Sequence, residues 1–363
     1  MSTPSLRPGL AFDPTPLTDP VDQAQVRAHH EHLKTTRPRT SGGVFLSIVL
    51  VAIALFALIP LGMLFSDLAH LPSGAIVVAS VLVVIAAVAT LITVRVRRRV
   101  RRDREIRYRL DRFAEANAMT YLDRIANPDL PGMIFSVGGD RFATDVLRST
   151  TSPVVEYGHH QYLVRTGKNS TLFRWGYIAI ELGTELPHIV LDAVANNSAL
   201  GTNLPASFPD YQRLSLEGDF DRYFELYCPK GYERDALYLF SPDIMARFID
   251  RAALFDVEIV DNTLFLYTGP GISTTNPEQW AWLFDTVNAL RLKADQWTRW
   301  RDERLEQPAA AIPSPSSPSA PPVRPQGVAV DGRRLRRGPN KVTLWATVIV
   351  GALAVLGVII EIF

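Results

Sequence analysis

The sequence predicts an α+β fold, a membrane-anchored domain with an antiparallel or mixed sheet and flanking helices, plus three transmembrane helices. Two observations predict it. The 363-residue chain is 47% hydrophobic, and three blocks within it, residues 44–65, 75–94 and 342–360, contain no charged residue. Each block is long enough to cross ~30 Å of hydrocarbon as a helix. Between the second and third blocks, short β-like runs alternate with helical patterns, which is typical of an α+β domain.

The first part of the chain is predicted to lie at the membrane. Residues 1–42 are polar and rich in proline, so we expect a disordered cytoplasmic N-terminus. The first two blocks predict a transmembrane helical hairpin over residues 43–95. Basic clusters precede the first block, follow the second and precede the third, and a hairpin places all three on one side. The positive-inside rule makes that side the cytoplasm, which predicts a multi-pass protein of the inner membrane with its main domain in the cytoplasm.

Arginines are concentrated directly after the second block. Residues 96–118 are predicted to form a basic juxtamembrane helix. Each basic residue near an anionic membrane surface contributes ~1 kcal/mol to binding, so we expect anionic lipids as a partner. The arginines expected to face the lipid are Arg95, Arg97, Arg98, Arg99, Arg101, Arg102 and Arg104.

Residues 119–305 are predicted to form one cytoplasmic α+β domain. Ser241 and Pro242 are typical of a helix start, because a hydroxyl residue precedes proline at the first helical position. Two β-like runs, 257–260 and 263–267, flank Asp261 and Asn262 and predict a hairpin. Residues 306–341 are rich in proline, alanine and serine, which predicts an extended linker. Residues 342–363 are predicted to form the C-terminal transmembrane helix.

One stretch carries a family resemblance. The residues concerned are Leu214–Glu217, Phe220, Phe224, Leu226–Tyr227, Ala236–Met245 and Leu264–Tyr267. They resemble an actinobacterial membrane protein family that carries a cytoplasmic domain of unknown function after a two-helix membrane hairpin. The resemblance implies a single folded unit from Leu214 to Tyr267, and it implies no catalytic or binding residue.

No motif in the sequence predicts catalysis, a cofactor or a metal site. His159 and His160 are adjacent, with His188 further on, but neighbouring residues of a strand point to opposite faces. The single cysteine, Cys228, has no histidine near it in sequence. An acidic group lacks the EF-hand pattern and is typical of a turn and a solvated strand face; its members are Glu217, Asp219, Asp221 and Glu225.

These observations favour a binding protein over an enzyme. The 119–305 domain carries more acidic than basic side chains, which argues against nucleic acid as its partner. We therefore expect a non-enzymatic integral membrane protein that presents a cytoplasmic binding or scaffolding domain to a protein partner or to a second copy. The alternatives are a membrane-associated enzyme with its site in the same domain, and an accessory subunit of a transport or secretion assembly.

Overall fold

The computed structural model describes residues 12–36, 74–167, 169–197, 202–216, 218–306, 328 and 332–338. The chain divides into two compact units. One comprises Met1–Asp19 with Arg109–Phe363, and the other comprises Pro20–Tyr108. Helix α4 (Gly74–Ala116) runs through the boundary between them.

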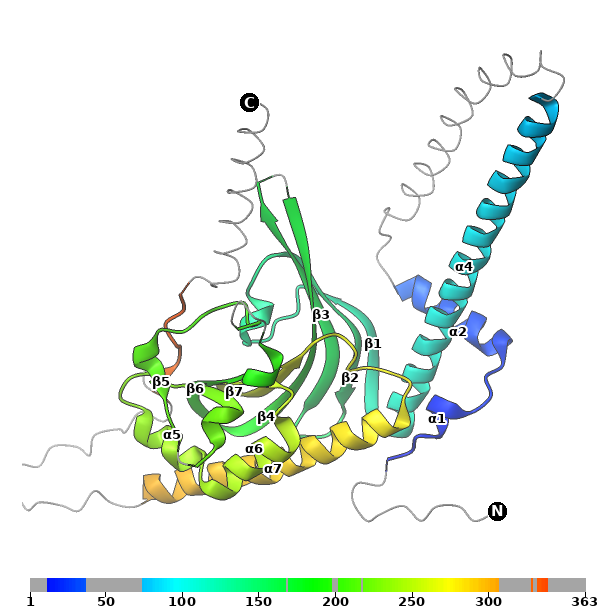
Figure 1. Cartoon of the computed structure of the whole chain (residues 1–363). Helices are drawn as coiled ribbons and strands as arrows, with labels where there is room; N and C mark the ends of the chain where they lie inside the picture. The colour runs from blue at the N-terminus through cyan, green and yellow to red at the C-terminus, as the bar shows by residue number, and fades with distance from the viewer. Residues whose placement is uncertain are drawn as a thin grey trace, which may run out of the picture. The chain divides into compact units, whose positions relative to one another are not determined.

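The first unit is built on a seven-stranded sheet whose paired strands are all antiparallel (Figure 1). The strand order is β1-β2-β3-β4-β6-β5, and β7 pairs with β4. The strands are β1 (Met119–Ala126), β2 (Gly139–Ser149), β3 (Val155–Thr166), β4 (Asn169–Ala193), β5 (Arg213–Leu214), β6 (Phe224–Tyr227) and β7 (Asp256–Thr268).

Strand β4 holds the sheet together, because it pairs with β3, β6 and β7. Its middle part, residues 175–180, is buried at every position. A strand that is buried on both faces lies between two packed layers. The hairpin predicted around Asp261 is instead one bent strand, β7, both halves of which pair with β4. Asp261 has a left-handed φ of 54°, the backbone signal of a turn, but here it bends the strand.

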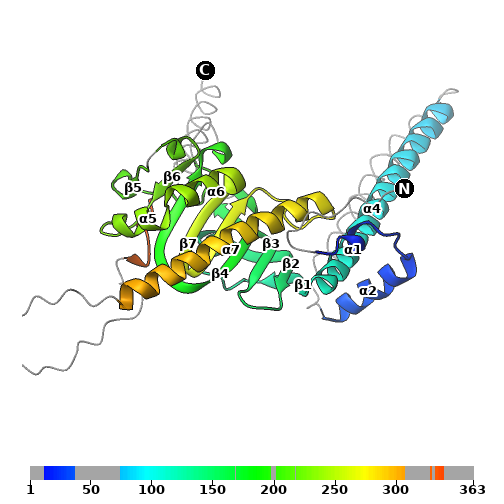
Figure 2. The ribbon, with the colours of Figure 1, turned by 90° about the horizontal axis from the view of Figure 1, so that it is seen from below.

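Helices cover one face of this sheet (Figure 2). They are α5 (Glu233–Leu239), α6 (Pro242–Ala252) and α7 (Pro277–Glu306). Helix α6 begins at Pro242 and buries Ile244 and Phe248. On α7, Trp280 is fully buried, and its ring centroid lies 5.3 Å from that of Tyr157 on β3.

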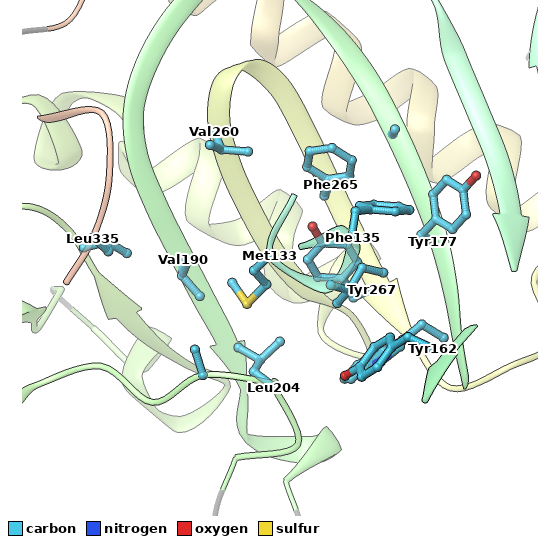
Figure 3. Packing of buried hydrophobic residues seen from close by; sticks show 14 of the residues in the cluster. Met133, Phe135, Tyr162, Tyr177, Val190, Leu204, Val260, Phe265, Tyr267 and Leu335 are labelled. Carbon is cyan, nitrogen blue, oxygen red and sulfur yellow. The ribbon is translucent and has the colours of Figure 1, made fainter. Parts of the chain in front are cut away.

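Loops and a short helical turn cover the opposite face. The 3-10 helix η1 (Met133–Phe135) is buried there with Tyr177, Phe265 and Tyr267 (Figure 3). Leu335, from the described part of the C-terminal region, belongs to the same apolar cluster and is 4% exposed. Leu335 lies within the range expected to be an extended linker. The core is therefore completed by a residue that follows the last helix of the domain.

The prediction of three transmembrane helices needs correction. Residues 44–65 and 342–360 lie outside the described residues, and residues 75–94 fall within α4. Among the helices that the structure describes, none has the combination of length and apolar character that crossing a bilayer requires. The prediction took residues 75–94 as a membrane-crossing helix because they are apolar and contain no charged residue. In the structure they are one part of a 43-residue helix that continues through the arginine-rich residues to Ala116. A multi-pass membrane topology is accordingly not supported.

The second unit contains α2 (Gln23–Thr36) and most of α4. The Tyr108 hydroxyl on α4 donates a hydrogen bond of 2.7 Å to Gln25 Oε1 on α2. The same tyrosine ring packs edge-on against His29, with a centroid distance of 5.5 Å. The short helix α1 (Thr15–Thr18) belongs to the first unit, where Arg109 donates to the Leu17 carbonyl at 2.8 Å.

Candidate peptide-docking site

The candidate site lies on the loop-covered face of the sheet, where β4 and β7 run side by side. Successive strand residues point to opposite faces, so His188, Val190 and Asp192 share one face of β4. Val190 pairs with Glu258 of β7, which brings a carboxylate next to His188. Both His188 and Glu258 are fully buried. Buried polar groups need hydrogen-bond partners. The partners of His188 and Glu258 define the site.

Glu258 accepts hydrogen bonds at both carboxylate oxygens. His188 Nε2 lies 2.8 Å from Oε1, and the Tyr267 hydroxyl and the Met133 amide donate to Oε2 at 2.6 and 2.7 Å. Burial alone would raise the pKa of Glu258, but these hydrogen bonds, with that from His188 the foremost, hold it below the ordinary value. Burial, assisted by the adjacent Glu258, raises the pKa of Tyr267 well above its ordinary value. Glu258 is therefore a carboxylate and Tyr267 a neutral donor.

A short basic segment, residues 332–338, occupies the site. The Leu335 backbone N–H donates a 2.9 Å hydrogen bond to His188 Nδ1. A backbone amide can only donate, so Nδ1 carries no proton and His188 is the neutral tautomer that donates from Nε2 to Glu258. The histidine thus links the buried carboxylate to the backbone of the segment. The Leu335 side chain enters the apolar cluster that contains Val190 and Val260 (Figure 3).

The site also recognises the backbone of the segment on either side of Leu335. Gln212, which is 4% exposed, donates from Nε2 to the Arg336 carbonyl and accepts from the Arg336 N–H, both at 2.9 Å. A side-chain amide that makes both bonds to one residue imitates the pairing of a neighbouring strand. Further along, the Gly338 N–H donates to the Ser207 carbonyl at 2.8 Å in an antiparallel bridge.

Acidic side chains of the domain pair with the arginines of the segment. Arg334 makes a two-bond contact with Asp261, with nitrogen–oxygen distances of 2.6 and 2.8 Å. The hydrogen bond from Arg334 lowers the pKa of Asp261. Arg337 lies 3.8 Å from Glu258, and Arg333 lies 4.0 Å from Glu185. All four arginines are exposed, and Gln212 holds Arg336 through its backbone.

The arrangement is suited to binding. The lone cysteine, Cys228, is 2% exposed, and burial raises the pKa of its thiol to about 12, so it is a poor nucleophile. Within the described residues, no set of three or more histidine, cysteine, aspartate or glutamate side chains is positioned to hold a metal ion. His188, Gln212 and Asp261 contact the backbone or side chains of an extended segment, as peptide-recognition sites do.

The structure separates the histidines that stand out in the sequence. His160 Nε2 lies 3.1 Å from the Ile134 carbonyl, and burial lowers the pKa of His160 to about 4. His159 points to the other side of β3 and accepts a hydrogen bond from the Gly271 N–H at 3.1 Å. Neither contacts His188, which belongs to the docking site. The pair has structural roles in separate parts of the sheet.

The acidic group does not form a site either. Glu217 lies outside the described residues. Asp221 bonds to the Ser215 hydroxyl and accepts from the Leu216 N–H at 3.2 Å. Glu225 accepts from the Tyr227 hydroxyl at 2.7 Å and lies 3.3 Å from Arg213. Asp219 precedes the 3-10 turn η4 (Phe220–Arg222).

The arginine segment lies on helix α4, and the prediction that it is helical is confirmed. Arg95, Arg97, Arg98, Arg99, Arg101 and Arg102 are exposed, whereas Arg104 is half-buried. No contact in the structure tests the predicted role of these residues in binding lipid. The docking site itself was missed, because the arginines around Leu335 were interpreted only as a topology signal. A single leucine between two pairs of arginines was the sequence signal that could have found it.

Comparisons with known proteins assign no family. A scan against protein-family models gives no match, and a search of the curated proteins gives none either. Among solved structures, the chain is similar to the crystal structure of the mycobacterial trehalose monomycolate transport factor A, TtfA, with a TM-score of 0.35 and 12% identity. The match covers 52% of this chain and 93% of that chain. A similarity of this size identifies neither the family nor the activity of this chain, and no family match supports the resemblance noted in its sequence.

Proposed function

We propose that this protein is a non-enzymatic binding protein whose sheet domain holds an extended basic peptide segment, and that residues 332–338 occupy the site in cis. One observation carries the proposal. Gln212 and His188 bind the backbone of this segment while Leu335 fills an apolar pocket between them. Backbone hydrogen bonds supply affinity in such a site, and a pocket for alternate side chains supplies specificity.

The contacts define the sequence that the site accepts. The central position takes an apolar side chain, because the Leu335 pocket is lined by buried apolar residues. The position before it takes arginine, whose planar guanidinium matches the Asp261 carboxylate. The position after it is expected to be unrestricted, since Gln212 holds Arg336 through its backbone. A partner with an exposed arginine–leucine pair in an extended segment would fit.

The proposal is tested by measuring whether a separate peptide binds the domain once the cis segment has been released. In the full chain, Leu335→Asp places a charge in the apolar pocket and should release the cis segment. A fluorescent peptide covering residues 331–339 should then bind this variant, and should bind the wild-type chain at least roughly tenfold more weakly, because the cis segment competes at high effective concentration.

Matched peptides separate specific docking from general attraction between opposite charges. A peptide with alanine in place of the Arg336 residue should bind nearly as well as the native one. A peptide with aspartate in place of the leucine should lose at least roughly 30-fold, since burying one leucine is worth about 2 kcal/mol. Equal binding of all three peptides, or binding by none, would refute the proposal.

The arginine segment of α4 is a second proposed binding surface, for anionic lipid. The supporting observation is that the arginines from Arg95 to Arg102 are exposed along one continuous helix. Electrostatic attraction of this kind needs no insertion into the hydrocarbon.

A further inference from the structure

The hydrogen bond between His188 and the docked segment depends on the charge of the imidazole ring. The Leu335 N–H donates to Nδ1 at 2.9 Å, and Nε2 lies 2.8 Å from Glu258 Oε1. A protonated histidine carries a hydrogen on both ring nitrogens and can only donate. In the charged ring, the Nδ1 hydrogen would point at the hydrogen of the Leu335 amide. Protonation at Nδ1 and docking of the segment are therefore mutually exclusive in this geometry.

The docked segment also covers the nitrogen that would take up the proton. His188 is fully buried, and Leu335, whose amide lies against Nδ1, is 4% exposed. A buried charge costs free energy unless it is paired and hydrogen-bonded. Release of the segment uncovers Nδ1 to water, while Glu258 stays at Nε2 to pair with the charged ring. The released state therefore binds a proton more readily than the docked state.

The arginines of the segment act in the same direction. Arg337 lies 3.8 Å from Glu258, and Arg334 makes two hydrogen bonds to Asp261. Asp261 also interacts electrostatically with His188. A charged His188 and the arginines would thus repel each other and compete for the same two carboxylates.

The other titratable groups around His188 keep their charge as the pH falls from 7.5 to 5.5. Against the effect of burial, hydrogen bonds, with that from His188 the foremost, hold the pKa of Glu258 below its ordinary value. The hydrogen bond from Arg334 lowers the pKa of Asp261, and burial raises that of Tyr267 far above this range. Arginine stays charged, whereas histidine is the side chain that ordinarily titrates here.

We propose that protonation of His188 releases the docked segment, so that the site holds a peptide at neutral pH and gives it up in acid. This inference rests on the proposed function, since it concerns the regulation of the same site. A group that takes up one proton only on release raises the dissociation constant by at most about tenfold for each pH unit. The sign is fixed by the same linkage: docking is favoured at high pH and lost as the pH falls.

Peptide binding at two pH values tests the inference. The receptor is the full chain with Leu335→Asp, and the probe is a fluorescent peptide covering residues 331–339 with both ends blocked. Its dissociation constant should rise roughly tenfold between pH 7.5 and pH 5.5, a partial transition over two pH units. In the receptor that also carries His188→Gln, it should change by less than roughly threefold, because an amide supplies a donor and an acceptor at both pH values.

His159→Gln in the same receptor is the matched control. His159 lies on β3, where it accepts the Gly271 N–H, and its replacement should leave the full pH response of peptide binding. Burial raises the pKa of Asp256 to about 7 and that of Asp192 to about 6, so both aspartates also titrate in this range. They are present in every receptor, and an effect that came from them would persist in His188→Gln.

The outcomes separate this inference from the proposed function. Equal peptide binding at both pH values, or an equal loss of binding in His188→Gln, would overturn the inference and leave the proposed function standing. The absence of peptide binding at pH 7.5 would refute both.

Amide hydrogen exchange in the wild-type chain keeps the test decisive if His188→Gln fails to fold. After correction for the intrinsic exchange rate at each pH, the protection of the Leu335 amide should fall roughly tenfold from pH 7.5 to pH 5.5. The protection of the β4 amides should stay unchanged. Constant protection at Leu335 would overturn the inference.

Discussion

At the scale of single residues, a fully buried histidine links the sheet to the docked segment. His188 donates from Nε2 to Glu258 and accepts the Leu335 N–H at Nδ1, so each ring nitrogen has one defined role. Gln212 acts in a similar way with its amide, donating and accepting at Arg336. Both side chains are buried and hydrogen-bonded at both polar atoms, which makes either one costly to remove. Replacement of either should therefore weaken docking more than the loss of an exposed contact.

His160 gives a prediction for the pH dependence of stability. Burial lowers its pKa to about 4, against 6.5 in the unfolded chain. A histidine with a lowered folded pKa contributes stability above pH 6.5, and this contribution is lost as the pH falls toward 4. The free energy of unfolding should therefore decrease by about 3 kcal/mol over that window. In His160→Gln, which keeps a donor for the Ile134 carbonyl, urea titrations between pH 7.5 and 4.5 should show a smaller decrease. An unchanged decrease would assign the effect to other groups.

At the scale of elements, the arginines of the docked segment make different contacts with the domain, so they are not equivalent. The side chain of Arg334 makes two hydrogen bonds to Asp261, while Arg336 is held by Gln212 through its backbone. Arg334→Ala should lower the free energy of unfolding by about 1 kcal/mol, the upper end for a partly exposed ion pair. Arg336→Ala should change it by less than about 0.5 kcal/mol. Urea titration of both variants checks this, and equal losses would mean that only net charge matters.

Helix α4 gives the prediction for the lipid-binding surface. Replacing Arg98, Arg99, Arg101 and Arg102 by glutamine should weaken binding to anionic vesicles at least roughly 100-fold at low salt, since each basic residue contributes ~1 kcal/mol. Flotation with vesicles containing phosphatidylserine measures the effect, which should fade at high salt. Replacing the exposed Arg234 and Arg247 of α5 and α6 by glutamine is the matched control. Equal flotation of both variants would remove the proposed role.

At the scale of the whole molecule, local patterns were easier to predict than contacts between distant segments. The start of α6 at Pro242 followed from the preference for proline at the first helical position, although the Ser241 side chain makes no capping hydrogen bond. The bent strand β7 was mistaken for a hairpin because Asp261 has turn chemistry, while its pairing with β4 depends on residues that are 66 to 92 positions away. The transmembrane prediction depended on the apolar character of three blocks. Of these, residues 75–94 lie in helix α4, and none of the described helices is long and apolar enough to cross a membrane.

The candidate site depended even more on distant contacts. His188 and Leu335 are 147 positions apart, and Gln212 and Arg336 are 124 apart. No spacing rule connects such residues in a single sequence. The charge pattern held a partial signal, since an acidic domain is followed by the basic residues 333–337. The same arginines also fit the positive-inside rule, which accounts for them without any contact with the domain.

The most direct test of the central claim is amide hydrogen exchange at Leu335, Arg336 and Gly338 in the full wild-type chain. If the sheet domain holds this segment as described, these three amides donate to His188, Gln212 and Ser207 and should exchange at least roughly 100-fold more slowly than free peptide amides. In Leu335→Asp the protection should be lost, while the amides of β4 should stay protected. Exchange of the three amides at the rate of a free peptide in the wild-type chain would contradict the account.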